Sequence, residues 1–398
     1  MAFVDDRSRL RIIGFSVLLA ATVLTGAVAA GGDLAALATD AARTIAGDRA
    51  VATLEDLAYG ARDRPERMRH EGEPPTAHWA VPWPALEVTE RGRPATRADL
   101  PWSPRDVGPM YDDFAAEGDG RWVSVTTGDG EAVMKKTLLH PDRTRSLAEL
   151  FVVAIDLSGA ALHYVPGTAE PENVAPGADA LERSAEVPAQ DRDALLAAFN
   201  GGFKTRHGQH GVEVSGLTLV PMRSGLCTLV GRADGSVALA AFEKVPSRED
   251  AAFVRQSARC LVEDGVRHPG LVQELTASWG AAVGGDTVIR RSAIGISADG
   301  RTLFVGVSNR TTAPALADGM RHAGARTGAQ LDVNEAFPRF LTYEKSADGK
   351  LVAESIAPGF HYRAGHYVDA PSSRDFFYLT RKSAVLAVRA AAVHASGG

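Results

Sequence analysis

Cysteine is scarce in this chain, which holds only Cys227 and Cys260. Two cysteines exclude a disulfide-dense scaffold and any zinc site built from several thiolates. In an oxidising compartment the two could pair. Their separate positions in the apolar runs Leu226 to Val230 and Cys260 to Val262 favour two buried, unpaired thiols instead. We therefore expect unpaired cysteines, with a disulfide as the alternative.

An excess of positive charge is also lacking. The chain carries 43 lysines and arginines against 49 aspartates and glutamates, a formal net charge of -6. No basic field is available to a nucleic-acid backbone, so nucleic acid is not an expected partner.

Several common catalytic motifs are missing too. There is no Gly-x-Gly-x-x-Gly turn, no phosphate loop ending in Gly-Lys-Ser/Thr, no His-Glu-x-x-His and no Gly-x-Ser-x-Gly. The histidine pairs His207 with His210 and His361 with His366 have no carboxylate at a diagnostic metal-binding spacing. We expect neither a metal nor another cofactor.

Long apolar runs are absent except for one, Ile12 to Ala30, which spans about nineteen residues, long enough to cross a bilayer. Arginines precede it, the order that export machinery reads. Ala27-Val28-Ala29 fits a cleavage site, so residues 1–32 are predicted to be either a signal peptide or a membrane anchor. Both alternatives place the rest of the protein outside the cytosol, secreted or tethered in the cell envelope.

Residues 33–110 are predicted to form a helical and proline-rich segment that precedes the main domain. Apolar residues at helical spacing up to about Met68 predict one or two helices. A proline-rich stretch from His70 to Pro109 follows, and its prolines exclude both a helix and a central strand. Because free linkers are poor in aromatics, its tryptophans predict an extended segment that packs on the main domain: Trp79, Trp83 and Trp102.

The pattern of residues 111–385 predicts one α+β domain, with mixed or antiparallel sheets and interspersed helices. A tail at 386–398 follows it. Asp-Gly turns between apolar runs predict two hairpins, over 226–242 and 293–307. The pattern from Pro188 to Ala198 predicts a helix. Thr312 and Pro314 open another helix, which ends at Gly324.

Polar residues gather at three strand ends. Asn200-Gly201-Gly202 ends an apolar run, and glycines there let a ligand approach the main chain. Arg290 and Arg291 enter an apolar strand, and an arginine can hold a phosphate through two parallel hydrogen bonds. Asp332, followed by Asn334 and Glu335, leaves a third run where a carboxylate can act as acid, base or nucleophile. Ordinary turns and solvated strand ends are the alternative interpretation.

Taken in order, these segments resemble the phosphodiester glycosidase family, whose best-known member removes a capping N-acetylglucosamine from mannose 6-phosphate. The motifs concerned are Asn200-Gly201-Gly202-Phe203, Arg291-Ser292-Ala293-Ile294-Gly295 and Leu331-Asp332, and Cys260 to Gly265 resembles the strand and turn that precede the arginine. The resemblance covers roughly Val152 to Tyr378. It departs from the family after Asp332, where Val333-Asn334-Glu335 replaces a glycine-rich turn and looks like a bacterial branch with Leu-Asp-x-Asn.

The resemblance implies a hydrolase that cleaves a sugar-1-phosphodiester of an envelope or extracellular glycan. It implies that Arg291 binds the phosphate and that Asp332 acts at the anomeric carbon or its attacking water, with Glu335 or Glu213 as the second carboxylate. The implied sugar-binding groups are Asn200, Ser292, Asn334 and the backbone of Gly201 and Gly202. A non-catalytic envelope module that binds phosphate-containing glycans is the alternative, and a purely structural membrane-tethered protein ranks last.

Overall fold

The computed structural model describes residues 59, 61–81, 102–127, 132–271, 279 and 287–382. The apolar segment Ile12 to Ala30 and Trp83 lie outside this part, as do the tail and most of the predicted lead-in helices. Among the described residues, no helix is long and apolar enough to cross a membrane.

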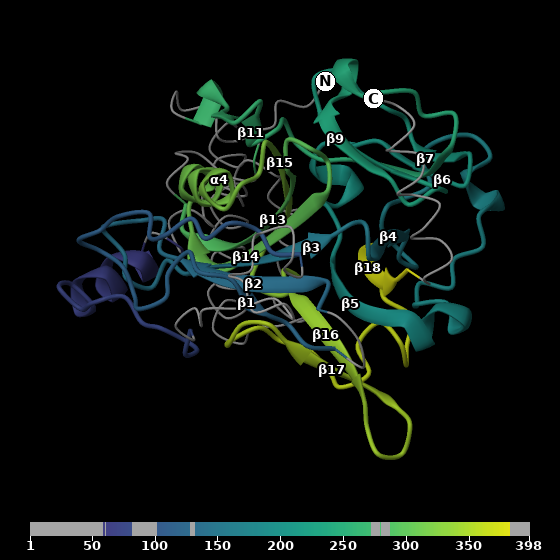
Figure 1. The fold of residues 1–398 in the computed structure, drawn as a ribbon. Coiled ribbons are helices and arrows are strands. Elements are labelled where there is room, and N and C mark those ends of the chain that lie inside the picture. The colour runs from purple at the N-terminus through teal and green to yellow at the C-terminus, as the bar shows by residue number, and fades with distance from the viewer. Residues whose placement is uncertain are drawn as a thin grey trace, which may run out of the picture.

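The central layer is an eight-stranded antiparallel sheet, drawn through the middle of Figure 1. Its strands, in spatial order, are β1 (Val123–Ser124), β2 (Met134–Leu139), β3 (Leu150–Asp156), β14 (Thr302–Thr311), β13 (Ile289–Ile296), β15 (Thr327–Val333), β11 (Val262–Glu263) and β12 (Val266–Arg267). All residues of β3 and β13 are buried, because the sheet is covered on both faces. Strands covered on both faces read as continuous runs rather than as an apolar–polar alternation.

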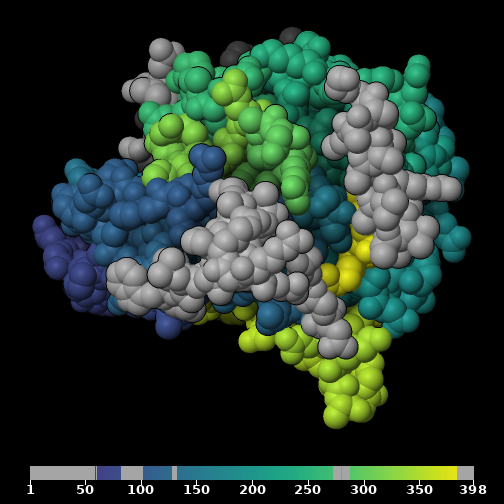
Figure 2. Space-filling view, viewed as in Figure 1, coloured from purple at the N-terminus to yellow at the C-terminus, as the bar shows by residue number. Residues whose placement is uncertain are grey.

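Two five-stranded antiparallel sheets pack on one face of this layer. The first runs β17 (Leu351–Ser355), β16 (Phe340–Lys345), β5 (Leu195–Asn200), β18 (Phe376–Arg381), β4 (Ala160–Val165). The second runs β7 (Leu217–Val220), β6 (Val212–Val214), β10 (Ala251–Gln256), β8 (Cys227–Arg232), β9 (Val237–Ala241). One hydrophobic core joins all three sheets through residues such as Phe199, Phe253 and Ile294. The β16–β17 hairpin projects from the body of the molecule (Figure 2).

Helix α4 (Ala313–His322) covers the other face of the central sheet and buries Leu316 and Met320 against it. Thr312 caps it by accepting a hydrogen bond from the backbone N–H of Ala315, and Gly324 adopts a φ of 115° after its end. The predicted helix is therefore confirmed. The other helical segment in the described part is residues 61–69, and the short 3₁₀ turns are η2 (Ala178–Ala180), η3 (Ala189–Ala194), η4 (Thr205–His207), η5 (Phe242–Lys244) and η6 (Pro269–Leu271).

The fold is richer in β-structure than the predicted mixture of sheets and helices. All strand pairings in the described residues are antiparallel, and helices are few. Both predicted hairpins are confirmed, as β8–β9 and β13–β14. The predicted helix over Pro188–Ala198 is wrong, because a 3₁₀ turn is followed by strand β5. A short apolar run buried on both faces cannot be distinguished from a buried helix by periodicity.

The proline-rich segment packs on the domain where it is described. Trp79 contacts the core that joins the three sheets, and its ring lies 6.0 Å from that of Phe151. Trp102 packs against the core beneath α4. For these two tryptophans the prediction of a packed, extended segment is confirmed.

The two cysteines form a disulfide, which corrects the expectation of unpaired thiols. Cys227 begins β8, and Cys260 lies just before β11 of the central sheet. Their apolar neighbours bury them as expected, but the packing of two sheets brings their Cα atoms to 4.7 Å. Separation along the sequence did not reveal this proximity.

We predict that replacing both cysteines by alanine lowers the free energy of unfolding by about 2–4 kcal/mol, the usual effect of releasing a closed loop. The sequence separation of the pair is 33 residues. Urea denaturation of the wild-type and double-variant proteins measures the difference. Equal unfolding midpoints, with the wild-type protein verified as oxidised by mass spectrometry, would show that the crosslink adds no stability.

Candidate active site

The three motif segments meet where the central sheet faces the sheet that holds β5. Asn200, at the end of β5, donates a hydrogen bond of 2.8 Å from Nδ2 to Oγ of Ser292 in β13. Ser292 in turn donates to the backbone carbonyl of Asp332 in β15, at 3.1 Å. Oδ1 of Asn200 accepts a hydrogen bond from the backbone N–H of Arg339. The sequence motifs are therefore brought together, with Asn200 and Ser292 as connectors between strands.

Gly201 and Gly202 form the backbone next to this junction. A Cβ atom at Gly201 would lie 2.4 Å from Cγ of Asp375, and one at Gly202 would lie 2.6 Å from an Nη atom of Arg255. Only glycine fits at such approaches. The glycines were predicted to allow close approach of a ligand, and the structure shows that they admit these two charged side chains.

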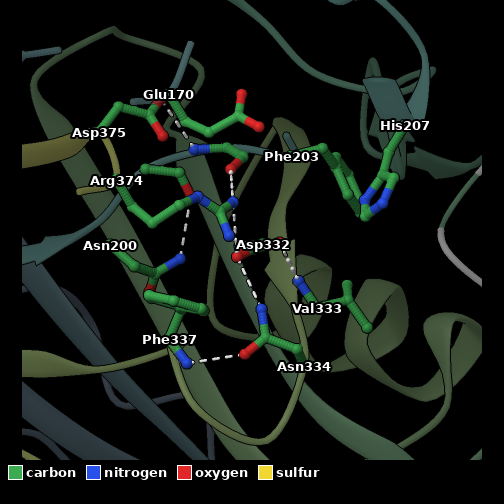
Figure 3. Close-up of polar contacts among 12 residues, drawn as sticks. Glu170, Asn200, Phe203, His207, Asp332, Val333, Asn334, Phe337, Arg374 and Asp375 are labelled. Atoms are coloured by element: carbon green, nitrogen blue, oxygen red, sulfur yellow. Dashed lines mark hydrogen bonds and ion pairs between the residues drawn. The ribbon is translucent and has the colours of Figure 1, made fainter. Parts of the chain in front are cut away.

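A buried ion pair lies at the centre of the site (Figure 3). An Nη atom of Arg374 is 2.9 Å from Oδ2 of Asp332, and both side chains are more than nine-tenths buried. The same nitrogen donates to the carbonyl of Gly202 at 3.0 Å, and the guanidinium lies over the ring of Phe337. Nε of Arg374 is buried without a hydrogen-bond partner in the described structure. A buried donor of this kind is costly unless a ligand or water accepts from it.

Asn334 holds the loop that carries the aspartate. Its Nδ2 donates to Oδ2 of Asp332 at 2.7 Å, while its Oδ1 accepts from the backbone N–H groups of Ala336 and Phe337. Oδ1 of Asp332 accepts from the backbone N–H of Val333 at 2.9 Å. The carboxylate is thereby fixed in one orientation.

A second buried ion pair supports the first. Oδ2 of Asp375 accepts from Nε of Arg255 at 2.9 Å and from the hydroxyl of Tyr164 at 3.0 Å. The backbone carbonyl of Asp375 accepts from the N–H of Gly201. Burial, together with the carboxylate of Asp375, raises the pKa of Tyr164 well above its usual value, so this hydroxyl stays a donor. The network holds the glycine turn in place.

Glu170 brings a third carboxylate to this region (Figure 3). Its Oε2 accepts a hydrogen bond of 2.8 Å from the backbone N–H of Thr205. Burial raises the pKa of Glu170, although that hydrogen bond and the positive charge of Arg374 partly oppose the rise. A carboxyl group with a raised pKa retains its proton at higher pH than usual, as a general acid requires.

Arg291 is paired with Val333, next to Asp332, but its described hydrogen bonds are made to the core. Its guanidinium is fully buried and donates to the carbonyls of Thr311 and Trp279, and to Oε1 of Gln330. The strand register shifts between Arg291 and Ala293, and the side chain is directed to the core under α4. Arg374 takes the position beside Asp332 instead.

The two candidates for the second carboxylate have other contacts. Glu335 lies 3.4 Å from Arg62 of the 61–69 helix, and its backbone carbonyl accepts from Arg290. Glu213, on β6 of the second five-stranded sheet, lies 3.4 Å from Arg248. In the described part of the structure, each of these carboxylates is thus paired with an arginine other than Arg374. The side-chain amides of Asn200 and Asn334 likewise make hydrogen bonds within the protein.

Sequence reasoning missed Arg374, Asp375, Arg255 and Glu170. Arg374 and Asp375 directly precede the apolar strand β18, the same cue that drew attention to the arginines before β13. Arg255 lies inside an apolar strand, and a buried charge there indicates a partner. Glu170 lies in a loop without any such pattern.

The four histidines considered as metal ligands do not gather. Among the described residues, no group of three or more histidine, cysteine, aspartate or glutamate side chains could hold a metal ion. His366 contacts Arg339 at 2.6 Å, and His210 packs against Phe203.

No protein-family model matches the chain. No curated protein matches it either. Three solved structures show a distant likeness in fold. The zebrafish N-acetylglucosamine-1-phosphodiester alpha-N-acetylglucosaminidase catalytic domain, auto-inhibited by its pro-peptide, is 13% identical, covers 66% of this chain and 88% of its own, with a TM-score of 0.42.

The other two are still more distant. A hypothetical protein from Synechocystis is 10% identical over 63% of this chain and 62% of its own, with a TM-score of 0.33. A Burkholderia pseudomallei protein described as exported is 13% identical over 63% of this chain and 75% of its own, with a TM-score of 0.31. These likenesses are too weak to assign an activity.

The buried His210 makes stability depend on pH. Burial, with the nearby charges of Arg255 and Arg223, lowers the pKa of His210 to about 3. The unfolded chain binds the proton near pH 6.5, so the folded state loses stability as the pH falls from about 6.5 towards 3, at up to about 1.4 kcal/mol per unit.

We predict that His210→Gln flattens this loss, whereas His361→Gln, at an exposed position, does not. Urea denaturation between neutral and mildly acidic pH measures the slope for each protein. The slope is compared rather than the absolute stability, because the substitution also changes packing. Parallel slopes in His210→Gln and wild-type protein would contradict the prediction.

Proposed function

We propose that the protein is an exported hydrolase that cleaves a sugar-1-phosphodiester of an envelope or extracellular glycan. The observation that carries this proposal is the buried, unpartnered Nε of Arg374 beside Asp332, at the junction of the three motif segments. A guanidinium with a free buried donor suits a phosphate oxygen. Asp332 supplies a fixed carboxylate next to it. The resemblance of these segments to the phosphodiester glycosidase family, in a bacterial branch, supports the same reaction.

Arg374, rather than Arg291, is assigned to the phosphate. The bond between the anomeric carbon and the phosphate oxygen breaks, and its electron pair leaves with the phosphate. Asp332 stabilises the developing positive charge at the anomeric carbon or takes the proton of the attacking water. The products are a free sugar and a phosphate monoester. Because phosphate leaves as a stable anion, charge stabilisation carries much of the barrier.

Glu170 is assigned as the second carboxyl group, in place of Glu335 or Glu213. Its raised pKa suits the donation of a proton to the leaving phosphate oxygen, or to a product. Asn200, Ser292 and Asn334 then position the strands and the carboxylate of Asp332 through the hydrogen bonds described above. Their contribution to sugar binding is indirect.

Export is supported by two features of the chain. The disulfide between Cys227 and Cys260 suits an oxidising compartment. The apolar segment Ile12 to Ala30, preceded by arginines, has the order of an export signal or anchor. A tether would hold the domain close to envelope glycans.

A binding module without catalytic activity is the second candidate. Both carboxylate oxygens of Asp332 accept hydrogen bonds within the protein, and its side chain is only 6% exposed. A nucleophile or base must reach its substrate, whereas a binding site needs only the cationic group beside it. This module would bind the same phosphate-containing glycans through Arg374.

We predict that the purified protein releases free sugar from a sugar-1-phosphodiester, and that Asp332→Asn and Arg374→Gln each lower kcat by about 100- to 1000-fold. A panel of sugar phosphodiesters taken from envelope polymers provides the substrates, and released sugar is measured by chromatography. Asp264→Asn and Arg326→Gln, at exposed and distant positions, are the matched controls.

Thermal melts establish that each variant is folded before its activity is compared. The hydrolase assignment fails when the wild-type protein releases no sugar from any member of the panel. Tight binding of a panel member by such an inactive protein would support the binding module instead. Full activity in folded Asp332→Asn would remove Asp332 from the mechanism.

A further inference from the structure

The helix of residues 61–69 is fixed to the domain by the side that bears its carboxylates. Asp63 accepts hydrogen bonds from Nε and an Nη atom of Arg145, at 3.0 and 2.8 Å. Glu66 forms an ion pair with Arg310 of β14. The negative charges of the helix are therefore compensated by arginines of the domain, and the helix is held in one orientation.

The opposite side of this helix is basic. Arg64, Arg67 and Met68 stand at positions i, i+3 and i+4, which places them on one face. All three are exposed, Met68 by 59%. Among the described residues, no side-chain hydrogen bond or ion pair involves Arg64 or Arg67. Arg69 adds an exposed cation at the end of the helix, and the exposed Glu71 in the turn that follows offsets one charge.

The helix lies at an outer edge of the molecule, as the purple segment at the left of Figures 1 and 2. The apolar segment Ile12 to Ala30 ends roughly thirty residues before the helix, a length that spans at most about 100 Å when fully extended. Whenever the apolar segment lies in a bilayer, the helix is therefore within reach of the bilayer surface.

We propose that the face formed by Arg64, Arg67 and Met68 binds the surface of an anionic lipid bilayer. Arginines are attracted to the negative potential of anionic headgroups, and an apolar side chain beside them enters the boundary between headgroups and acyl chains. A soluble polyanion would pair with the arginines and leave Met68 in water. The combination of unpaired cations with an exposed apolar side chain on one face favours the bilayer over an acidic glycan.

This contact goes beyond the proposed reaction and does not depend on it. Because the helix is tied to the domain through Asp63 and Glu66, binding to a bilayer fixes the orientation of the whole domain. Each arginine near an anionic surface strengthens binding about fivefold, and salt screens the attraction.

The test uses the full protein in vesicles of phosphatidylcholine alone or of equal parts of phosphatidylcholine and phosphatidylglycerol. Cys227 and Cys260 are joined in the disulfide, so Met68→Cys provides a reactive thiol for a fluorophore that senses polarity. We expect the emission of this label to shift to shorter wavelength, and to be quenched by brominated lipid, in the anionic vesicles only. Arg64→Gln/Arg67→Gln should weaken the contact about 25-fold, and high salt should abolish it.

Two controls locate the contact on this face. Lys345→Gln/Lys350→Gln removes the same charge from the β16–β17 hairpin, at another edge of the molecule in Figure 1, and should leave the contact unchanged. A label introduced by Val266→Cys, at a position that is 65% exposed on β12, should show neither shift nor quenching.

The proposal is overturned if the label at residue 68 responds equally in both kinds of vesicle, or in neither. It is also overturned if the double arginine variant responds like wild type. A response to a soluble phosphate-containing polymer, without one to vesicles, would reject the bilayer and identify a glycan as the partner of this face.

Discussion

The amide of Asn200 is the interaction on which the geometry of the site depends. It lies at the end of β5, in one sheet, and reaches Ser292 in the central sheet and the backbone of Arg339 before β16. Through Ser292 it is connected to the carbonyl of Asp332. An asparagine offers both donors and an acceptor, so one buried side chain bonds to the carbonyl of Gly201, the hydroxyl of Ser292 and the N–H of Arg339. Aspartate would lack the donors, and leucine would deprive the backbone N–H of Arg339 of its acceptor.

The charges near this amide are stable only as a set. Moving isolated ions into a protein interior costs several kcal/mol each, and an ion pair recovers this only with good geometry and further hydrogen bonds. Asp332 with Arg374 and Asp375 with Arg255 meet that condition. Each arginine also donates to a backbone carbonyl of the Gly202–Phe203 segment. The glycine turn thus serves both ion pairs, which explains why side chains are excluded there.

The sequence predicted the parts of this arrangement that depend on local pattern. Asp-Gly turns located the hairpins, and the Thr312 cap located α4, because these signals lie within a few residues. Asn200, Ser292 and Asp332 were found at strand ends and do meet. The guanidinium of Arg291 donates to groups of the core, and the shift in strand register beside this residue leaves no mark in the sequence.

Contacts between residues far apart in the sequence could not be predicted either. Arg374 lies far from Asp332 in sequence, and Cys227 meets Cys260 only because β8 packs against the central sheet. Neither contact follows from periodicity, since it depends on how sheets stack. The apolar run before Asn200 was assigned to a helix because burial on both faces removes the alternation that identifies a strand.

The loop after Asp332 lacks the glycine-rich turn of the family that the sequence resembles, and the structure shows what shapes the loop instead. Glycines would shape such a loop through backbone freedom, with N–H groups free to face a ligand. Here Asn334 shapes it with a side chain that accepts from Ala336 and Phe337 and donates to Asp332. The aspartate stays oriented, while backbone N–H groups that could face a ligand are consumed. In the proposed function, anion recognition therefore falls to side chains, and Arg374 is the cation that lies beside Asp332.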